Sequence, residues 1–311
     1  MKHRSNLQAV LEGAHFAVTA ECGPPRGADS QALREKAQIL KGCVDAVNVT
    51  DNQTAVVRLC SLASCAILKE MGLDPVLQMT TRDRNRIALQ SDLLGASALG
   101  IRNVLCLSGD HVCFGSEPQA MGVFDLDSIQ LLYAARTMRD QGKFIGGGAL
   151  SDPPKLFLGA VENPFADPLG FRARRLAKKV AAGAQFIQTQ CIYNLERFRE
   201  WMKQVRDLGL DQKTHILAGL TPLKSARMAR YMKEKVAGMD LPDAILERME
   251  KVPASKQTQE GIKIALETIE ALREIPGLRG IHIMAVEWEQ VVPQLVADSG
   301  LLPRPSVDRG Q

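Results

Sequence analysis

The sequence has no apolar run long enough to cross a membrane. Its longest stretch without a charged residue runs from Val180 to Leu195 and includes three glutamines, whereas a spanning helix needs about 20 mostly apolar residues. Glu12 also interrupts the N-terminal segment before it forms the apolar part of a signal peptide. We therefore expect a cytoplasmic protein without a membrane span.

An excess of charge of one sign is also missing. The 311 residues carry 39 Lys and Arg against 35 Asp and Glu, a net charge of only +4, and no dense basic tract supplies a footprint for nucleic acid. The apolar fraction of 45% and the charged fraction of 24% are ordinary for a globular protein. These values argue against nucleic acid as a partner and against wholesale disorder.

The cysteines form no cluster of the kind that binds metal. No C-x-x-C pair occurs, and the closest two, Cys60 and Cys65, lie five residues apart on a helix-like segment where they do not share a face. Free cysteines on apolar segments behave as small hydrophobic residues. We therefore expect no metal site within this chain. The seven cysteines are Cys22, Cys43, Cys60, Cys65, Cys106, Cys113 and Cys191.

Several nucleotide-binding and catalytic motifs are missing as well. The sequence contains no G-x-G-x-x-G and no G-x-x-x-x-G-K-[ST], which argues against the common nucleotide-binding open sheets. It contains no H-E-x-x-H and no Ser/His/Asp order, so zinc hydrolysis and acyl transfer lose support.

Short β-branched runs instead alternate with longer amphipathic segments. Eight strands are predicted, each followed by a helix, and most are apolar at consecutive positions, as buried parallel strands are. Eight strand–helix units favour a closed α/β fold, the (β/α)8 TIM barrel, which typically needs about 250 residues plus insertions. We predict one barrel domain over residues 1–311, with no regulatory domain. The predicted strands are 15–21, 44–50, 75–80, 103–109, 156–161, 185–190, 215–220 and 280–286.

Aspartates mark the starts of three predicted helices, and two loops interrupt the alternation. Asp29, Asp83 and Asp127 each precede an amphipathic segment as an N-cap does. Residues 111–126 follow the fourth strand, and the Gly- and Pro-rich residues 143–155 precede the fifth. Loops of this length within a compact domain are usually functional or mobile.

Polar side chains gather at the predicted ends of the strands, where barrels of this class place their active sites. A mouth rich in carboxylates and amides indicates a barrel enzyme that carries an acid, and the residues alone go no further. The strand-end residues are Glu21, Thr50, Asp51, Asn52, Gln78, Thr80, Thr81, Ser108, Asp110, His111, Glu162, Asn163, Gln188, Thr189 and Gln190.

Structural explanations for these residues remain open. Glu21, which precedes the rigid turn Cys22–Pro25, is a candidate general acid or a cap of the strand–loop junction. Asp110 fits a turn as well as a site. Gln190 can simply bond neighbouring backbone, and His111 can be an ordinary loop residue.

Three histidines and a basic helix also have structural explanations. His15, His215 and His282 fall in predicted strands, where we expect core or rim residues with satisfied hydrogen bonds. The helix after the fifth strand carries cations that indicate either a solvated face or, beside a barrel mouth, a phosphate site. These cations are Arg172, Arg174, Arg175, Lys178 and Lys179.

Four segments resemble the methylenetetrahydrofolate reductase family. Ala20–Pro25 resembles the E-x-x-P-P opening of that family, and Leu107–Asp110 resembles its R-G-D-type end of strand four. Ala182–Gln190 is similar to its A-G-A…T-Q segment, and Ala218–Pro222 is similar to its P-G-I-x-P strand seven with one change. The resemblance is collinear and covers the whole predicted barrel.

The resemblance implies a flavin-bearing barrel that reduces 5,10-methylenetetrahydrofolate to 5-methyltetrahydrofolate. On that basis Glu21 is the general acid that opens the methylene bridge to an iminium, and flavin N5 delivers hydride. Asp110 is expected near both flavin and pterin, with a catalytic role. Gln190 and Leu220 are the other implied folate contacts. The other implied flavin contacts are Thr50, Gln78, Thr80, His111, Arg172, Arg175 and Lys179.

The chain departs from the family pattern at several positions. Gln78 stands where the family often has histidine, and Val161 where it usually has tyrosine. Arg172 and Arg175 replace an acid and an amide that, in enzymes with flavin adenine dinucleotide (FAD), contact the ribityl–phosphate–adenine portion. Residues 285–288 replace the usual L-N-R. Extra arginines suit a terminal phosphate, so the cofactor expected is FAD or flavin mononucleotide (FMN).

The resemblance also bears on electron supply and partners. We expect NAD(P)H or a reduced partner protein as donor, since similar stand-alone chains of anaerobic, acetyl-CoA-pathway bacteria work beside an iron–sulfur- or zinc-bearing subunit. An oligomer is expected. Two alternatives stay open: a pterin-binding barrel that transfers methyl groups without redox chemistry, and a non-catalytic subunit of a larger assembly. Flavin content discriminates between the first alternative and the reductase.

Overall fold

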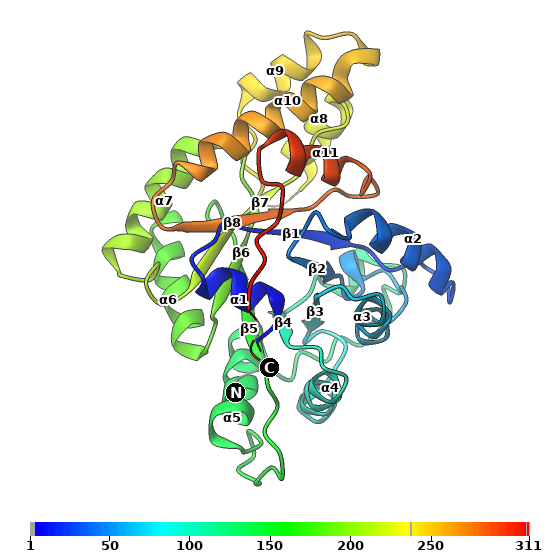
Figure 1. Cartoon of the computed structure of the whole chain (residues 1–311), viewed down its shortest axis with the longest axis vertical. Helices are drawn as coiled ribbons and strands as arrows, with labels where there is room; N and C mark the ends of the chain where they lie inside the picture. The colour runs from blue at the N-terminus through cyan, green and yellow to red at the C-terminus, as the bar shows by residue number, and fades with distance from the viewer. Residues whose placement is uncertain (1–3, 237, 309, 311) are drawn as a thin grey trace.

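The computed structural model of the chain describes residues 4–236, 238–308 and 310. Its eight strands are parallel and close into a barrel in sequence order, with β8 returning to pair with β1 (Figure 1). This arrangement confirms the predicted (β/α)8 TIM barrel. The strands are β1 (Ala17–Cys22), β2 (Ala46–Val49), β3 (Pro75–Thr80), β4 (Asn103–Leu107), β5 (Phe157–Glu162), β6 (Phe186–Cys191), β7 (His215–Leu220) and β8 (Leu278–Ile283).

Helices separate successive strands and surround the barrel (Figure 1). Two of the predicted N-caps are confirmed: Asp29 accepts hydrogen bonds from the N–H groups of the first turn of α2, and Asp127 forms a capping box with Gln130 on α5. The helices are α1 (Asn6–Glu12), α2 (Ser30–Leu40), α3 (Ser61–Glu70), α4 (Arg86–Ala98), α5 (Ser128–Gln141), α6 (Arg172–Ala182), α7 (Leu195–Asp207), α8 (Ala226–Lys235), α9 (Asp243–Glu250), α10 (Ala254–Arg273) and α11 (Val291–Asp298).

Other expectations about the elements were wrong. The N-cap of α4 is Asn85 and not Asp83, whose carboxylate instead pairs with Arg82 at 2.7 Å. His15 precedes β1 and is exposed rather than lying in the strand. Helices α1 and α9 were not predicted, because α1 is short and precedes the first strand, and α9 follows α8 without an intervening strand; α11 is the helix expected after the eighth strand. In the described part of the chain, no helix has the length and apolarity to cross a membrane.

The inside of the barrel changes from apolar to polar along its axis. Helix α1 closes the N-terminal end (Figure 1), where its apolar residues pack against interior side chains of seven strands. Among these, Phe157 and Phe186 stack with ring centroids 5.1 Å apart. Gly159 leaves room for this pair, since a Cβ there would lie 2.2 Å from the Phe186 ring. On four strands, the side chain two residues further along faces the same way and is polar: Thr19 on β1, Asn48 on β2, Gln78 on β3 and Gln188 on β6.

The two predicted loops lie at opposite ends of the barrel axis. Residues 111–126 follow the C-terminal end of β4 and contain the short helix η2 (Val112–Phe114). Residues 143–155 precede the N-terminal end of β5 and form a turn closed by a bridge between Lys143 and Ala149. Along the longest axis of the molecule, the α5–β5 connection lies at one extreme and α8–α10 at the other (Figure 1).

The burial of the cysteines makes their reactivity a test of the fold. Burial raises the pKa of the Cys22, Cys106 and Cys191 thiols to about 12 and that of Cys43 to about 11, and it raises the pKa of Cys65 as well. Only the thiolate is nucleophilic, so the five buried thiols should react slowly. The other two cysteines, Cys60 and Cys113, are exposed.

We therefore expect two of the seven thiols to react quickly with Ellman's reagent in the native protein at pH 8, and all seven in denaturant. The double variant Cys60→Ser/Cys113→Ser should lose the fast phase. Fast reaction of four or more native thiols would contradict this barrel packing.

Candidate functional site

A chain of hydrogen bonds crosses the barrel interior beneath the mouth. Asn48 and Gln188 exchange two amide hydrogen bonds of 2.7 and 3.0 Å, and Gln188 also donates to the Thr19 hydroxyl at 3.1 Å. Thr19 Oγ1 in turn lies 2.9 Å from His282 Nδ1. All four side chains are buried, and buried polar groups destabilise a fold unless each has a partner. We call Thr19, Asn48, Gln188 and His282 the polar layer.

Glu21 lies above the polar layer, near the C-terminal end of β1. Its Oε1 accepts a hydrogen bond of 3.3 Å from Gln78 Nε2 and lies 3.7 Å from His282 Nε2. Its Oε2 makes no hydrogen bond with any described residue. Glu21, Gln78, Gln190 and His282 line a cavity of about 220 Å³ at the barrel mouth. One carboxylate oxygen is therefore fixed by the protein, and the other is available to a bound molecule.

Asp110 connects two loops at the rim of the mouth. It is exposed, and its Oδ2 accepts a hydrogen bond of 3.1 Å from the N–H of Thr54, in the loop after β2. Asn52, Thr54 and Ala55 have φ angles of 47°, 55° and 56°, a left-handed conformation that costs non-glycine residues energy. A Cβ on Gly115 would lie 1.8 Å from the Ala55 carbonyl oxygen. This strained loop is thus held against the loop after β4.

Asp51 is a buried anchor at the ends of β2 and β3. Its Oδ2 accepts hydrogen bonds from the backbone N–H and the hydroxyl of Thr80, at 2.8 and 3.0 Å, and its Oδ1 accepts one from Ser61 at 3.1 Å. Arg84 adds a two-point ion pair, with Nη1–Oδ2 at 2.7 Å and Nη2–Oδ1 at 3.2 Å. The Thr80 hydroxyl is therefore engaged within the protein.

Glu162 and Lys179 form a second buried ion pair, between β5 and α6. Lys179 donates to the Glu162 carboxylate at 2.6 Å and to the carbonyl of Val161. Burial lowers the pKa of the Lys179 ammonium, and the Glu162 carboxylate offsets part of that shift. Arg172 Nη1 lies 3.9 Å from the same carboxylate. Lys179 thus ties the helix to the strand, whereas Arg175 makes no hydrogen bond with a described residue.

The remaining predicted contacts occupy three different places. Gln190 lines the mouth cavity, and its side-chain oxygen accepts a hydrogen bond of 3.0 Å from the N–H of Cys191. Leu220 is buried among the residues that pack between barrel and helices. His111 is exposed and caps η2. The structure therefore brings Glu21, Gln78 and Gln190 together around one cavity, and puts His111 on the rim and Leu220 in the core.

Buried polar atoms that lack a hydrogen-bond partner indicate whether the residues of the mouth suit a flavin. Among the described residues, Thr50 Oγ1, Thr81 Oγ1 and Arg172 Nε are buried and unpaired. Hydroxyls suit the polar edge of a flavin ring, and a guanidinium suits its phosphate. The cavity of about 220 Å³ is smaller than the ~300–1,000 Å³ of typical ligand pockets, so it would hold only part of a flavin. The unpaired hydroxyls and guanidinium therefore match the polar ring edge and the phosphate of a flavin in their chemistry.

The importance of His282 and Asp51 was not predicted from the sequence. His282 was expected only as a core or rim histidine, and Asp51 only as one of many polar strand ends. For His282 the one signal was its place in the eighth predicted strand; only the structure shows that His282 and Met284 line the same cavity. For Asp51 there was none, because its partner Arg84 is 33 residues further along the chain.

The fold and the site together define a (β/α)8 barrel protein with a partly buried carboxylate above a hydrogen-bonded polar interior. Its sequence matches the profile of the methylenetetrahydrofolate reductase family over residues 6–300. The chain belongs to this family, and the resemblance seen in the sequence is confirmed.

Two curated relatives are longer than this chain. A probable methylenetetrahydrofolate reductase (NADPH) of Caenorhabditis elegans is 24% identical over 244 residues, which are 78% of this chain and 34% of the relative. Methylenetetrahydrofolate reductase 2 of Schizosaccharomyces pombe is 26% identical over 239 residues, which are 73% and 36% of the two chains. The chain thus spans about a third of the length of the curated relatives it matches.

A solved structure of similar size shares the fold. An uncharacterized protein from Clostridium thermocellum, which binds two copies of 5-methyl-5,6,7,8-tetrahydrofolic acid, superposes with a TM-score of 0.62 over 94% of this chain and 98% of its own. The sequence identity is 15%, so the likeness concerns the arrangement of the barrel.

Replacing Asp51 should destabilise the protein far more than replacing another aspartate that contacts the same arginine. Asp51→Asn leaves Arg84 without its buried partner and should lower the free energy of unfolding by about 3–5 kcal/mol. Asp92, whose Oδ2 lies 2.9 Å from Arg84 Nε, is 32% exposed. Asp92→Asn should therefore cost only about 0–1 kcal/mol.

Urea denaturation of both variants measures the difference. Equal losses of stability in Asp51→Asn and Asp92→Asn would show that Asp51 is not the anchor of this rim.

Proposed function

We propose that the chain catalyses the reduction of 5,10-methylenetetrahydrofolate to 5-methyltetrahydrofolate, with a bound flavin. The observation that carries the proposal is Glu21, a carboxyl group in a polar cavity whose Oε1 is held by Gln78 and whose Oε2 is free of partners among the described residues. Membership in the reductase family supports the same chemistry. Folate, flavin and electron donor are therefore proposed ligands of this chain.

Glu21 acts in this proposal as the general acid. Protonated Glu21 donates its proton from Oε2 to N10 of the folate while the bond between N10 and the methylene carbon breaks. The electron pair of that bond stays on N10, and the lone pair of N5 forms an iminium with the methylene carbon. When bound, reduced flavin supplies a hydride. The product has gained one proton and one hydride, so the reaction balances.

His282 lies beside Glu21 and orients its carboxyl group. The Thr19 hydroxyl accepts a hydrogen bond from Gln188, and its own hydrogen points to His282 Nδ1 at 2.9 Å rather than to the Ile281 carbonyl at 3.4 Å. We therefore assign the histidine proton to Nε2, which faces Glu21 Oε1 at 3.7 Å. The polar layer thus fixes the tautomer next to the acid.

Gln190 and Asp110 are the proposed partners of the pterin. The oxygen of the Gln190 side chain is engaged by the N–H of Cys191, which leaves its NH₂ group to donate to a pterin acceptor. The Asp110 carboxylate uses one oxygen to hold Thr54 and has another for a bound ligand. Both residues therefore position substrate, whereas proton transfer belongs to Glu21.

The cofactor proposed is FAD or FMN, and Arg172 and Arg175 are the candidate contacts of its phosphate. Lys179 is a weaker candidate, because Glu162 and the Val161 carbonyl already occupy its ammonium group. NAD(P)H or a reduced partner protein, such as an iron–sulfur- or zinc-bearing subunit, would supply the electrons.

The spectrum of the purified protein tests the proposal first. We expect a yellow protein whose flavin absorbance is bleached by 5-methyltetrahydrofolate under anaerobic conditions. A colourless protein that neither FAD nor FMN reconstitutes would remove the proposal. If such a protein still bound folate, a methyl-transfer barrel would replace it.

Glu21→Gln should separate the two half-reactions. Loss of the general acid should slow folate turnover about 10²–10⁴-fold, whereas reduction of the flavin by an artificial donor should keep its rate. The matched control is Glu70→Gln, an equally conservative change at an exposed residue, which should leave both rates unchanged. Folate turnover at the wild-type rate in Glu21→Gln would remove Glu21 from this role.

A further inference from the structure

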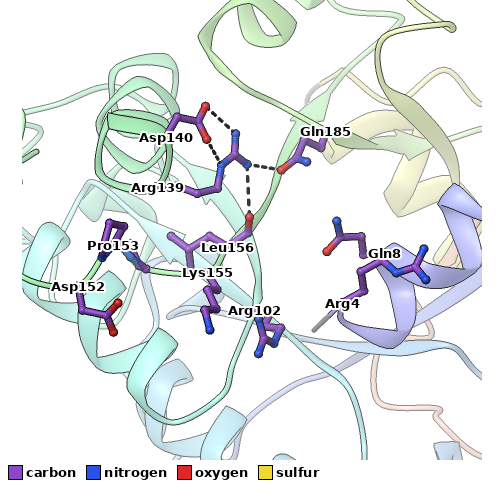
Figure 2. Close-up of a pocket in the computed structure, with 11 residues that line it drawn as sticks. Arg4, Gln8, Arg102, Arg139, Asp140, Asp152, Pro153, Lys155, Leu156 and Gln185 are labelled. Atoms are coloured by element: carbon purple, nitrogen blue, oxygen red, sulfur yellow. Dashed lines mark hydrogen bonds and ion pairs between the residues drawn. The ribbon is translucent and has the colours of Figure 1, made fainter. Parts of the chain in front are cut away.

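A second cavity lies at the end of the barrel opposite to Glu21. Its volume is about 630 Å³, against about 220 Å³ for the cavity at the mouth. Arg102, Leu156 and Gln185, the residues just before β4, β5 and β6, line it together with α1 and the end of α5. Figure 2 shows this arrangement. The cavity therefore opens on the N-terminal face of the barrel, away from the proposed reaction.

The wall of this cavity is held in place by its own hydrogen bonds. Arg139 Nε and Nη2 bond both oxygens of Asp140, at 2.6 and 3.1 Å, and Nη1 donates to Gln185 and to the Leu156 carbonyl (Figure 2). The N–H of Lys155 donates to the hydroxyl of Ser97 at 3.0 Å. The segment before β5, which the sequence marked as an insertion, is thus the preformed wall of a cavity.

Two cations in this cavity have no partner in the described part of the chain. The side chains of Arg102 and Lys155 make no hydrogen bond or ion pair with any described residue, whereas Arg139 is fully engaged. In Figure 2 their charged ends point away from the Arg139–Asp140 pair. Arg4 also lines the cavity and is held by Glu12 at 3.4 Å. Unpaired cations in a concave site attract anions.

The remaining lining residues suit the organic part of a ligand. Pro153, Pro154 and Leu156 supply apolar surface, and Gln8 supplies an amide. Asp152 is the one acid of the lining without a partner among the described residues, so two unpaired cations face one unpaired carboxylate there. The net charge of these unpaired groups is therefore positive, and it lies beside apolar surface.

We propose that this cavity binds a small organic phosphate of about mononucleotide size. Its volume lies within the ~300–1,000 Å³ typical of small-molecule sites. The Arg102 guanidinium can bind two phosphate oxygens at once, and Lys155 adds a second positive charge. The organic part lies against Pro153, Pro154 and Leu156. This inference does not depend on the proposed reductase function, because no lining residue belongs to the mouth.

Titration calorimetry of the purified full-length chain tests the proposal, with adenosine 5′-monophosphate as probe at low salt. The nucleotide should bind at least about tenfold more tightly than inorganic phosphate, and adenosine should bind more weakly still. Arg102→Gln and Lys155→Gln should each weaken nucleotide binding about tenfold or more, as expected for a lost charge-assisted contact. Lys155→Arg, which keeps the charge, should retain binding.

Two matched controls locate the binding. Arg227→Gln removes one exposed positive charge on α8, and Arg172→Gln removes one at the mouth; both should bind the nucleotide as the wild type does. Unliganded melting temperatures should be unchanged in Arg102→Gln and Lys155→Gln, since neither side chain has a partner to lose. The proposal would be overturned if all variants bound the nucleotide equally well, or if only Arg172→Gln lost affinity for it. It would also be overturned if inorganic phosphate bound as tightly as the nucleotide, or if the nucleotide did not bind.

Discussion

The mouth of this barrel depends on burying four polar side chains in the barrel interior without leaving one unpaired. Thr19, Asn48, Gln188 and His282 come from four different strands, and each finds its partner only when the barrel is closed. An unpaired buried polar group would cost about 1–3 kcal/mol, so closure and the polar layer stabilise one another. His282 connects this layer to Glu21, whose Oε1 also accepts a hydrogen bond from Gln78 outside the layer.

The two ends of the barrel are built for different purposes. Toward the N-terminal end, stacked phenylalanines and α1 fill the interior with apolar side chains, so the chain can carry a polar interior above them. At the C-terminal end, Asp51 and Asp110 hold loops that would otherwise relax, including three residues with left-handed backbone. Strain of this kind persists where the surrounding contacts enforce it, and such places are often functional.

The sequence predicted the local features of the fold well and the long-range pairs poorly. Eight apolar runs were enough to predict eight strands, and the polar residues after them identified the end of the barrel at which Glu21 lies. Asp83 was mistaken for a helix cap because both it and Asn85 can fill that position, and only the structure shows Arg82 taking the carboxylate. The cavity beside Lys155 joins elements distant in the chain, and Glu162 and Lys179 lie 17 residues apart on two different elements, so no local sequence pattern predicts either feature.

We propose that the polar layer positions Glu21 for proton transfer. Thr19→Val tests this most directly, because it removes one hydroxyl, keeps the side-chain shape, and leaves both Glu21 and His282 in the protein. The pH profile of folate reduction should be measured beside that of flavin reduction. We expect a rate of folate reduction about tenfold lower, with an altered pH profile and unchanged flavin reduction. An unchanged pH profile for folate reduction would contradict it.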